Sequence, residues 1–172
     1  KIALQFPYNL QRSILGDSFD HIRLLIKFSK ELEFYDLHFA KTYSNNYYIF
    51  GYPFFLIYNL LFTSEYVASA LALATLNCIS LSIFFIFFYL TIFNISKNFL
   101  ISVSTCFFLI CFEFFFFTTR IYPDVLQFSL ISVSYFYLFS NKANKYLYAT
   151  IFASLAFGTK AQGLIIFCFI LF

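Results

Sequence analysis

The sequence predicts an all-α protein: a polytopic transmembrane helix bundle that follows an N-terminal loop carrying an amphipathic interfacial helix. Three observations lead to this fold class. Of the 172 residues, 62% are hydrophobic and only 11% are charged, with a mean hydropathy of +0.81. Most of the charges fall in the first 50 residues. The remainder consists of apolar runs separated by short polar turns, which is typical of chains that cross a bilayer repeatedly.

The composition excludes a soluble enzyme. Soluble domains carry roughly a quarter charged residues, and a chain of this size leaves much of its surface exposed. A net charge of +3, scattered along the chain, does not indicate nucleic acid as a partner. The four cysteines lie inside apolar runs without metal-ligand spacing, so we expect neither a zinc site nor a disulfide framework.

The first predicted domain, residues 1–52, is a loop on the extracytoplasmic or lumenal side. Its helix is expected from 19 to 32, where an apolar face alternates with a charged face at helical spacing. The apolar face contains Phe19, Ile22, Leu25, Ile26 and Ser29; the charged face contains Asp20, Arg23, Lys27 and Lys30. Such a helix fits a membrane interface. The polar and aromatic stretch 43–52 is predicted to be a loop at the depth of the lipid headgroups.

The second predicted domain, residues 53–172, is the transmembrane region, with about four to five apolar segments. These segments are 66–93, 99–117, 125–139, 146–157 and 164–172. A shorter apolar run, 54–62, precedes them and is too short to span. The chain begins at Lys1 without a methionine and ends inside an apolar run, so we expect it to be an internal fragment of a longer protein.

Lysines in the short turns predict the orientation in the membrane. Lys97 lies in one turn, while Lys142 and Lys145 lie in another, and an even number of crossings separates the two. Both turns are therefore expected on the cytoplasmic side, because short cytoplasmic loops are enriched in Lys and Arg. The N-terminal region and the turn 120–124 then share the opposite side. The sequon at Asn94 would be cytoplasmic and remain unglycosylated.

Asp17 and Asp20 are the first candidates for chemistry. They lie three residues apart at a predicted helix start and therefore share one face. Two carboxylates there can divide the role of general base from that of binding a metal or orienting a hydroxyl. The alternative is structural: Asp17 caps the helix and Asp20 complements its dipole.

Other charged residues lie at or near the predicted membrane edge. Arg120 and Asp124 bracket a Tyr-Pro turn, and Lys160 lies between two glycines. They could bind a phosphate and a substrate hydroxyl, or serve as an interfacial anchor and a polar turn. Glu113 lies near the end of a span, and its depth decides its role. The two histidines, His21 and His38, show no metal-ligand spacing and are interpreted as interfacial.

Four motifs in this order resemble the GT-C superfamily of polytopic glycosyltransferases, in particular the dolichyl-phosphate-mannose-protein-mannosyltransferase-like and RgtA/B/C/D-like group. The resemblance covers about residues 12–170. The motifs are Gly16-Asp17-Ser18-Phe19-Asp20-His21, Gly51-Tyr52-Pro53, Thr119-Arg120-Ile121-Tyr122-Pro123-Asp124 and Leu155-Ala156-Phe157-Gly158-Thr159-Lys160-Ala161-Gln162-Gly163-Leu164.

The resemblance implies an inverting membrane enzyme that uses a polyprenyl-phosphate-linked sugar at the extracytoplasmic or lumenal face. Localisation would be the plasma membrane in a prokaryote and the endoplasmic reticulum in a eukaryote. Asp17 matches the catalytic acid–base position of the family, but the second acid is Asp20 instead of an adjacent Glu. The hypothesis assigns Asp20 and Asp124 to orienting substrate or a divalent cation, the candidate cofactor, and Arg120 and Lys160 to the phosphate. The sugar and the acceptor are not specified by the sequence.

Two other readings remain open at this point. A multi-pass transporter or lipid flippase component would also place charges and broken helices at a membrane, but it predicts an internal repeat, and the sequence shows none. A non-catalytic membrane scaffold would tolerate the combined loss of Asp17, Asp20 and Asp124.

Overall fold

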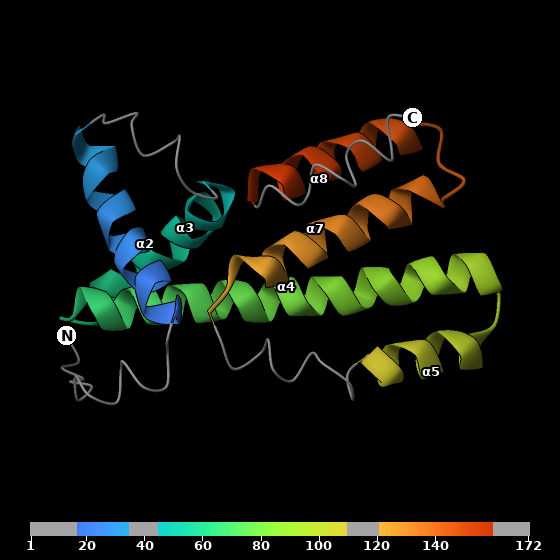
Figure 1. Ribbon diagram of the computed structural model, residues 1–172, viewed down its shortest axis with the longest axis horizontal. Coiled ribbons are helices and arrows are strands. Elements are labelled where there is room, and N and C mark those ends of the chain that lie inside the picture. The colour runs from blue at the N-terminus through green and yellow to red at the C-terminus, as the bar shows by residue number, and fades with distance from the viewer. Residues whose placement is uncertain (1–16, 35–44, 110–120, 160–172) are drawn as a thin grey trace.

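The computed structural model describes residues 17–34, 45–109 and 121–159, and every described regular element is a helix. Figure 1 shows their arrangement along the longest helix, α4. In chain order they are α2 (Asp17–Phe34), α3 (Asn45–Leu61), α4 (Glu65–Ser96), α5 (Phe99–Leu109), α7 (Pro123–Leu138) and α8 (Lys145–Thr159). The all-α prediction is confirmed for these residues.

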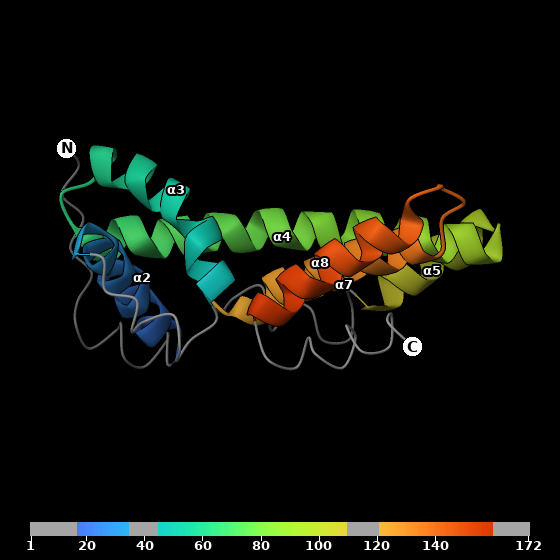
Figure 2. The ribbon, with the colours of Figure 1, turned by 90° about the horizontal axis from the view of Figure 1, so that it is seen from above.

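The helices form two groups along α4. Helices α2 and α3 pack against its N-terminal half and are here called the head. Helices α5, α7 and α8 lie along its C-terminal half, with α7 between α4 and α8. The turn from α4 to α5 and the turn from α7 to α8 lie at the same end of the molecule (Figures 1 and 2). The prediction that both lysine-bearing turns lie on the same side of a membrane is compatible with this placement and stays a prediction.

Helix α2 has the two faces that its sequence predicted. Ile22, Leu25 and Ile26 are buried against α3 and α4, whereas Arg23 and Lys27 are exposed. The Ser69 hydroxyl on α4 donates a hydrogen bond of 3.0 Å to the backbone oxygen of Ile22. The apolar face of α2 is therefore covered by protein. Burying such a face is what stabilises a single amphipathic helix.

The prediction of a loop over 43–52 is wrong for its described part. Helix α3 begins at Asn45 and continues through Pro53 to Leu61, so the boundary expected between residues 52 and 53 falls inside one helix. Gly51 does not form a turn here. A Cβ atom at this position would lie 3.0 Å from Leu73 Cδ2, so the missing side chain permits close approach of α3 to α4.

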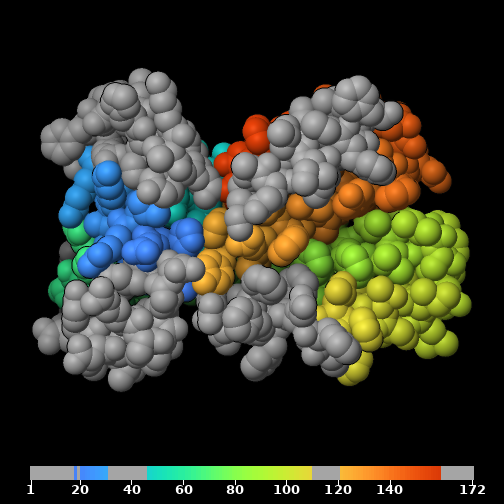
Figure 3. All heavy atoms as spheres, in the orientation of Figure 1, coloured from blue at the N-terminus to red at the C-terminus, as the bar shows by residue number. Residues whose placement is uncertain are grey.

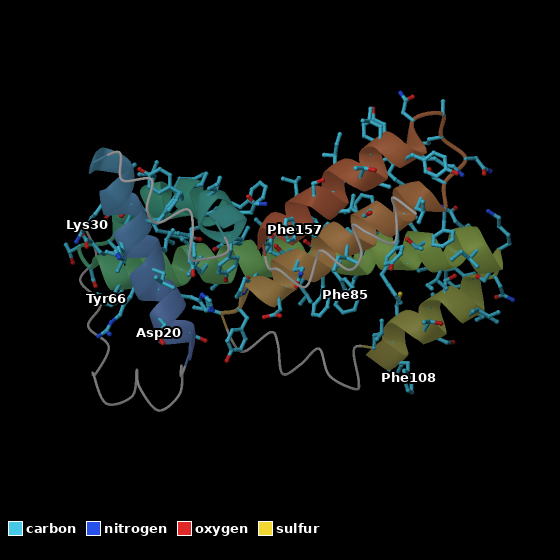
Figure 4. The ribbon with its side chains drawn as sticks, turned by 45° about the horizontal axis from the view of Figure 1, so that its top comes forward. Asp20, Lys30, Tyr66, Phe85, Phe108 and Phe157 are labelled. Carbon is cyan, nitrogen blue, oxygen red and sulfur yellow. The ribbon has the colours of Figure 1, made fainter. Side chains whose placement is uncertain are left out.

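The C-terminal group buries small polar side chains and exposes large apolar ones. Ser102 and Ser134 are fully buried, whereas Leu100 is 71% exposed and Phe107 is 65% exposed. Figure 4 shows Phe108 on α5 pointing away from α4. On α8 the buried positions are Ala149, Ala153, Ala156 and Thr159. Helix α7 also buries large apolar side chains, among them Leu126 and Leu130.

Within the described residues, only α4 is both long and apolar enough to cross a membrane. Its 32 residues confirm the first predicted span, 66–93, as a continuous apolar helix. Helix α5 is apolar but has 11 residues, while α7 and α8 have 16 and 15. The predicted span 99–117 extends beyond the described residues, and the predicted span 164–172 lies wholly outside them.

Candidate functional site

The starts of three helices meet around His21. The imidazole Nδ1 of His21 lies 2.8 Å from the hydroxyl of Tyr48 on α3. The ring of Tyr122, directly before α7, meets the histidine ring edge-on at 6.0 Å between centroids. Tyr47 makes a second edge-on contact at 5.9 Å. We call His21, Tyr47, Tyr48, Tyr122 and their neighbour Asn77 the His21 cluster.

Tyr47 connects this cluster to α4. Its hydroxyl donates a hydrogen bond of 3.0 Å to Asn77 Oδ1, and the tyrosine side chain is fully buried. Burial raises the pKa of Tyr47 well above its usual value of 10.0, and the neighbouring Tyr48 and the negative charge of Asp124 raise it further. The hydrogen bond that Tyr47 makes to Asn77 acts in the opposite direction and lowers the pKa. The phenol therefore remains neutral and serves as a hydrogen-bond donor at physiological pH.

A buried hydrogen bond joins the start of α2 to the start of α7. The backbone N–H of Ile121 donates to Ser18 Oγ at 3.0 Å, and Ser18 is fully buried. In Figure 3 the atoms of α2 (blue) meet those at the start of α7 (light orange) on the same face. The two segments that carry the predicted acids are therefore in direct contact, although 103 positions separate the bonded residues.

The start of α3 also holds the end of α8. Asn46 Nδ2 donates a hydrogen bond of 2.8 Å to the backbone oxygen of Leu155, which also accepts one from Thr159 Oγ1 at 2.9 Å. A Cβ atom on Gly158 would lie 2.4 Å from Asn46 Nδ2. A larger residue at this contact would displace the Asn46 side chain, so the Gly158 of the fourth motif has a packing role.

The predicted site residues fall partly inside the described structure. Asp20 is exposed near the N-terminal end of α2 (Figure 4), and Asp124 is half-buried in the first turn of α7. Asp17 is the first residue of α2, but its side chain lies outside the described part. Arg120 and Lys160 also lie outside the described residues.

Helix geometry favours acidic side chains at these positions. Asp124 follows Pro123 in the first turn of α7, where unpaired backbone N–H groups create partial positive charge. Pro is well suited to this place because it has no N–H to satisfy. The structural alternative for Asp124, completing a helix start, is therefore compatible with a role toward substrate.

Sequence reasoning missed most of the His21 cluster. His21 was interpreted as an ordinary interfacial residue, and the two tyrosines were placed in a loop. Their only signal in the sequence is the Asn-Tyr-Tyr triplet at 46–48, which has no periodic pattern of its own. The contacts that distinguish these residues join positions 27 and 30 residues apart.

The described residues do not by themselves form a metal centre. Across 17–34, 45–109 and 121–159, no three His, Cys, Asp or Glu residues gather at ligand distance. Two described carboxylates, Asp20 and Asp124, remain as candidate ligands for the divalent cation considered above.

Comparison with known proteins gives no assignment. No protein-family model, no curated protein and no solved structure matches this chain.

Proposed function

We propose that this chain is part of a multi-pass membrane glycosyltransferase. It would transfer a sugar from a polyprenyl-phosphate-linked donor to an acceptor at the extracytoplasmic or lumenal face. One observation carries the proposal: the buried Ser18–Ile121 hydrogen bond brings the acid-bearing start of α2 against the start of α7. This contact lies at the end of α7 opposite to the lysine-bearing turn.

Helix length supports placing this contact at a membrane boundary. Asn77 belongs to the His21 cluster, and Lys97 ends α4 in the turn that carries the predicted cytoplasmic charge. The 20-residue separation corresponds to about 30 Å along a helix, which equals the thickness of the hydrocarbon core. With Lys97 at one water boundary, the His21 cluster lies at the other. The head then projects beyond the membrane.

The distribution of side chains supports several crossings. Exposed Phe and Leu on α5 and α8 would face lipid, while serine and alanine permit close contact between α7 and α8. Ser134 Oγ donates a hydrogen bond of 2.8 Å to the backbone oxygen of Ala149 across this contact. Helices α7 and α8, each about 24 Å long, fall slightly short of a full crossing and need polar flanks or local thinning of the bilayer.

The proposed chemistry needs a base and a stabilised anion. Attack by an acceptor hydroxyl on the anomeric carbon breaks its bond to the phosphate oxygen, so the lipid phosphate leaves as an anion and the configuration inverts. Asp17 would accept the hydroxyl proton, while Asp20 and Asp124 would orient substrate or a divalent cation. Arg120 and Lys160 would hold the phosphate. The positive ends of α2, α3 and α7 around His21 add favourable electrostatics for that anion.

The test uses the complete protein, purified and reconstituted in lipid vesicles. Polyprenyl-phosphate mannose is supplied as the first donor, and release of polyprenyl phosphate is measured. Asp17→Asn is expected to lower turnover by at least about a hundredfold, as removal of a general base does. Asp20→Asn and Asp124→Asn should each lower it by about tenfold or more.

Glu65→Gln is the matched control. Glu65 is an exposed acid at the far end of the head, where it pairs with Lys30 at 3.0 Å. Its loss should leave turnover within about twofold, because exposed ion pairs contribute little. Undiminished transfer by Asp17→Asn would remove Asp17 from the mechanism. Movement of the intact donor across the vesicle membrane, without cleavage, would favour a lipid transporter.

A further inference from the structure

We propose that the first turn of α3, formed by Asn46, Tyr47 and Tyr48, positions the site's helices relative to one another. The inference rests on the proposed function for its catalytic readout. It adds residues that act through other groups and are not expected to touch the reacting atoms.

Three consecutive side chains of this turn reach three different helices. Asn46 bonds to the end of α8, Tyr47 to Asn77 on α4, and Tyr48 to His21 on α2. Successive residues of a helix point about 100° apart, so three in a row cover more than half of its circumference. Helix α3 is therefore held on three sides at this level.

Helix α7 is connected to the same turn by a ring contact and by an electrostatic interaction. The ring of His21 contacts Tyr122, which directly precedes α7, and the negative charge of Asp124 acts on the buried hydroxyl of Tyr47. Asp20 lies one residue before His21 on α2. A displacement of the turn thus changes the spacing between Asp20 and Asp124, the two described acids of the proposed site.

Full burial makes this turn stiff. Tyr47 and Tyr48 are both 0% exposed, and each uses its hydroxyl in a hydrogen bond to another helix. Their rings also meet each other edge-on, at 5.6 Å between centroids. A fully satisfied buried polar network favours one arrangement of the helices that share it.

The first test removes one hydroxyl and keeps its ring. Tyr48→Phe should lower polyprenyl-phosphate release by about tenfold per folded enzyme, because small displacements of catalytic groups are costly. Tyr52→Phe is the matched control. Tyr52 lies one turn later on the same helix, its ring contacts Phe28 and Phe55, and its hydroxyl has no hydrogen bond to the described residues. Turnover of the control should stay within about twofold.

Two readouts separate positioning from a general loss of structure. Acylation of His21 by diethylpyrocarbonate, with His38 as internal reference, should become at least about threefold faster in Tyr48→Phe, because the Nδ1 atom of His21 then loses its hydrogen bond of 2.8 Å to the Tyr48 hydroxyl. The pH–turnover profile should move by about half a pH unit or more. Less folded enzyme would scale that profile without moving it. Among the ring contacts and hydrogen bonds of the described residues, those of Tyr47, Tyr48 and Tyr122 face His21.

The second test uses the close contact between Asn46 and Gly158. Gly158→Ala should lower turnover by about tenfold, because the new methyl group displaces the Asn46 side chain. Asn46→Ala should cost about threefold through loss of one hydrogen bond. The double variant should match Asn46→Ala, because the methyl group then finds space. Such non-additivity identifies direct coupling.

The outcomes distinguish failure of the positioning role from failure of the proposed function. Transfer that depends on Asp17 but not on Tyr48 or Gly158 overturns the positioning role and leaves the proposed function standing. Absence of transfer in the unchanged protein overturns the proposed function. In that case the Asn46 and Gly158 variants are compared by thermal unfolding in place of turnover. A double variant as stable as Asn46→Ala supports the coupling of α3 to α8, whereas additive losses overturn it.

Discussion

The backbone N–H of Ile121 donates a buried hydrogen bond of 3.0 Å to the hydroxyl oxygen of Ser18. Ser18→Ala would leave this N–H buried without its acceptor, at a cost of about 1–3 kcal/mol. We expect a lower melting temperature and slower transfer. Ser82→Ala is the control, because that exposed hydroxyl bonds only within α4. Equal melting temperatures for the two variants would contradict the importance of the α2–α7 contact.

Tyr47 makes stability fall at alkaline pH. Its pKa is raised in the folded protein by burial, Tyr48 and Asp124, so the unfolded chain releases this proton first. Stability is therefore fully present below about pH 10 and decreases as the pH rises further. Tyr47→Phe should lose about 1–2 kcal/mol at neutral pH through its missing hydrogen bond to Asn77.

Between pH 9 and 11, Tyr47→Phe should lose less additional stability than the unchanged protein. Melting temperatures across that range provide the measurement, and Tyr58→Phe serves as a second tyrosine variant that keeps the Tyr47 hydroxyl. Parallel alkaline curves for the unchanged protein and Tyr47→Phe would exclude Tyr47 as the titrating group.

The contact between α7 and α8 depends on small side chains. Ala153 is fully buried, whereas the adjacent Ser154 is exposed. Ala153→Leu should separate the helices and cost about 1–3 kcal/mol, because overpacking strains a close contact. Ser154→Leu should be tolerated on an outer face that already carries Ile151. The yield of monodisperse protein in detergent and its melting temperature distinguish the two variants.

Membrane orientation can be tested with single cysteines. After the native cysteines are replaced by serine, cysteines at Asp20 and Lys142 are labelled with an impermeant maleimide in sealed vesicles. The proposed topology expects these two positions to react from opposite sides of the membrane, with Lys97 on the same side as Lys142. Labelling of Asp20 and Lys142 from one side would refute the proposed placement of the site.

Helices α2 and α4 were predictable because their sequences contain the whole signal. The face of Ile22, Leu25 and Ile26 repeats at helical spacing, and the structure buries it. Helix α4 is continuous through 66–93, where no charge or proline interrupts the apolar run. Its end near the lysine turn was also predicted, although Lys97 adopts a left-handed φ of 54° that only the structure shows.

Helix α3 was not predictable in the same way. Asn45, Asn46, Gly51 and Pro53 are residues that favour turns when they act locally. Here the Asn46 side chain donates a hydrogen bond to α8, and the missing side chain of Gly51 leaves room for Leu73. Long-range packing therefore overrides the local preference.

The candidate site also contains residues that the sequence predicted and residues that it did not. Asp124 was found because charges are rare in the apolar part of the chain, and Asp20 because of its spacing from Asp17 at a helix start. The structure places both near the His21 cluster. Tyr47 and Asn77 were missed because polar residues of this kind become informative only when burial and a partner are known. Their functional roles remain predictions.

The length of α4 makes the position of the site depend on the thickness of the bilayer. Its 32 residues correspond to about 48 Å, well beyond the roughly 30 Å of a hydrocarbon core. On the proposed placement, residues 65–76 stand outside the lipid and carry the head. A thinner bilayer tilts such a helix further and a thicker one draws it upright, so the head would change its height above the lipid headgroups. Lipid composition could thereby regulate access of a lipid-borne donor, without any separate regulatory ligand.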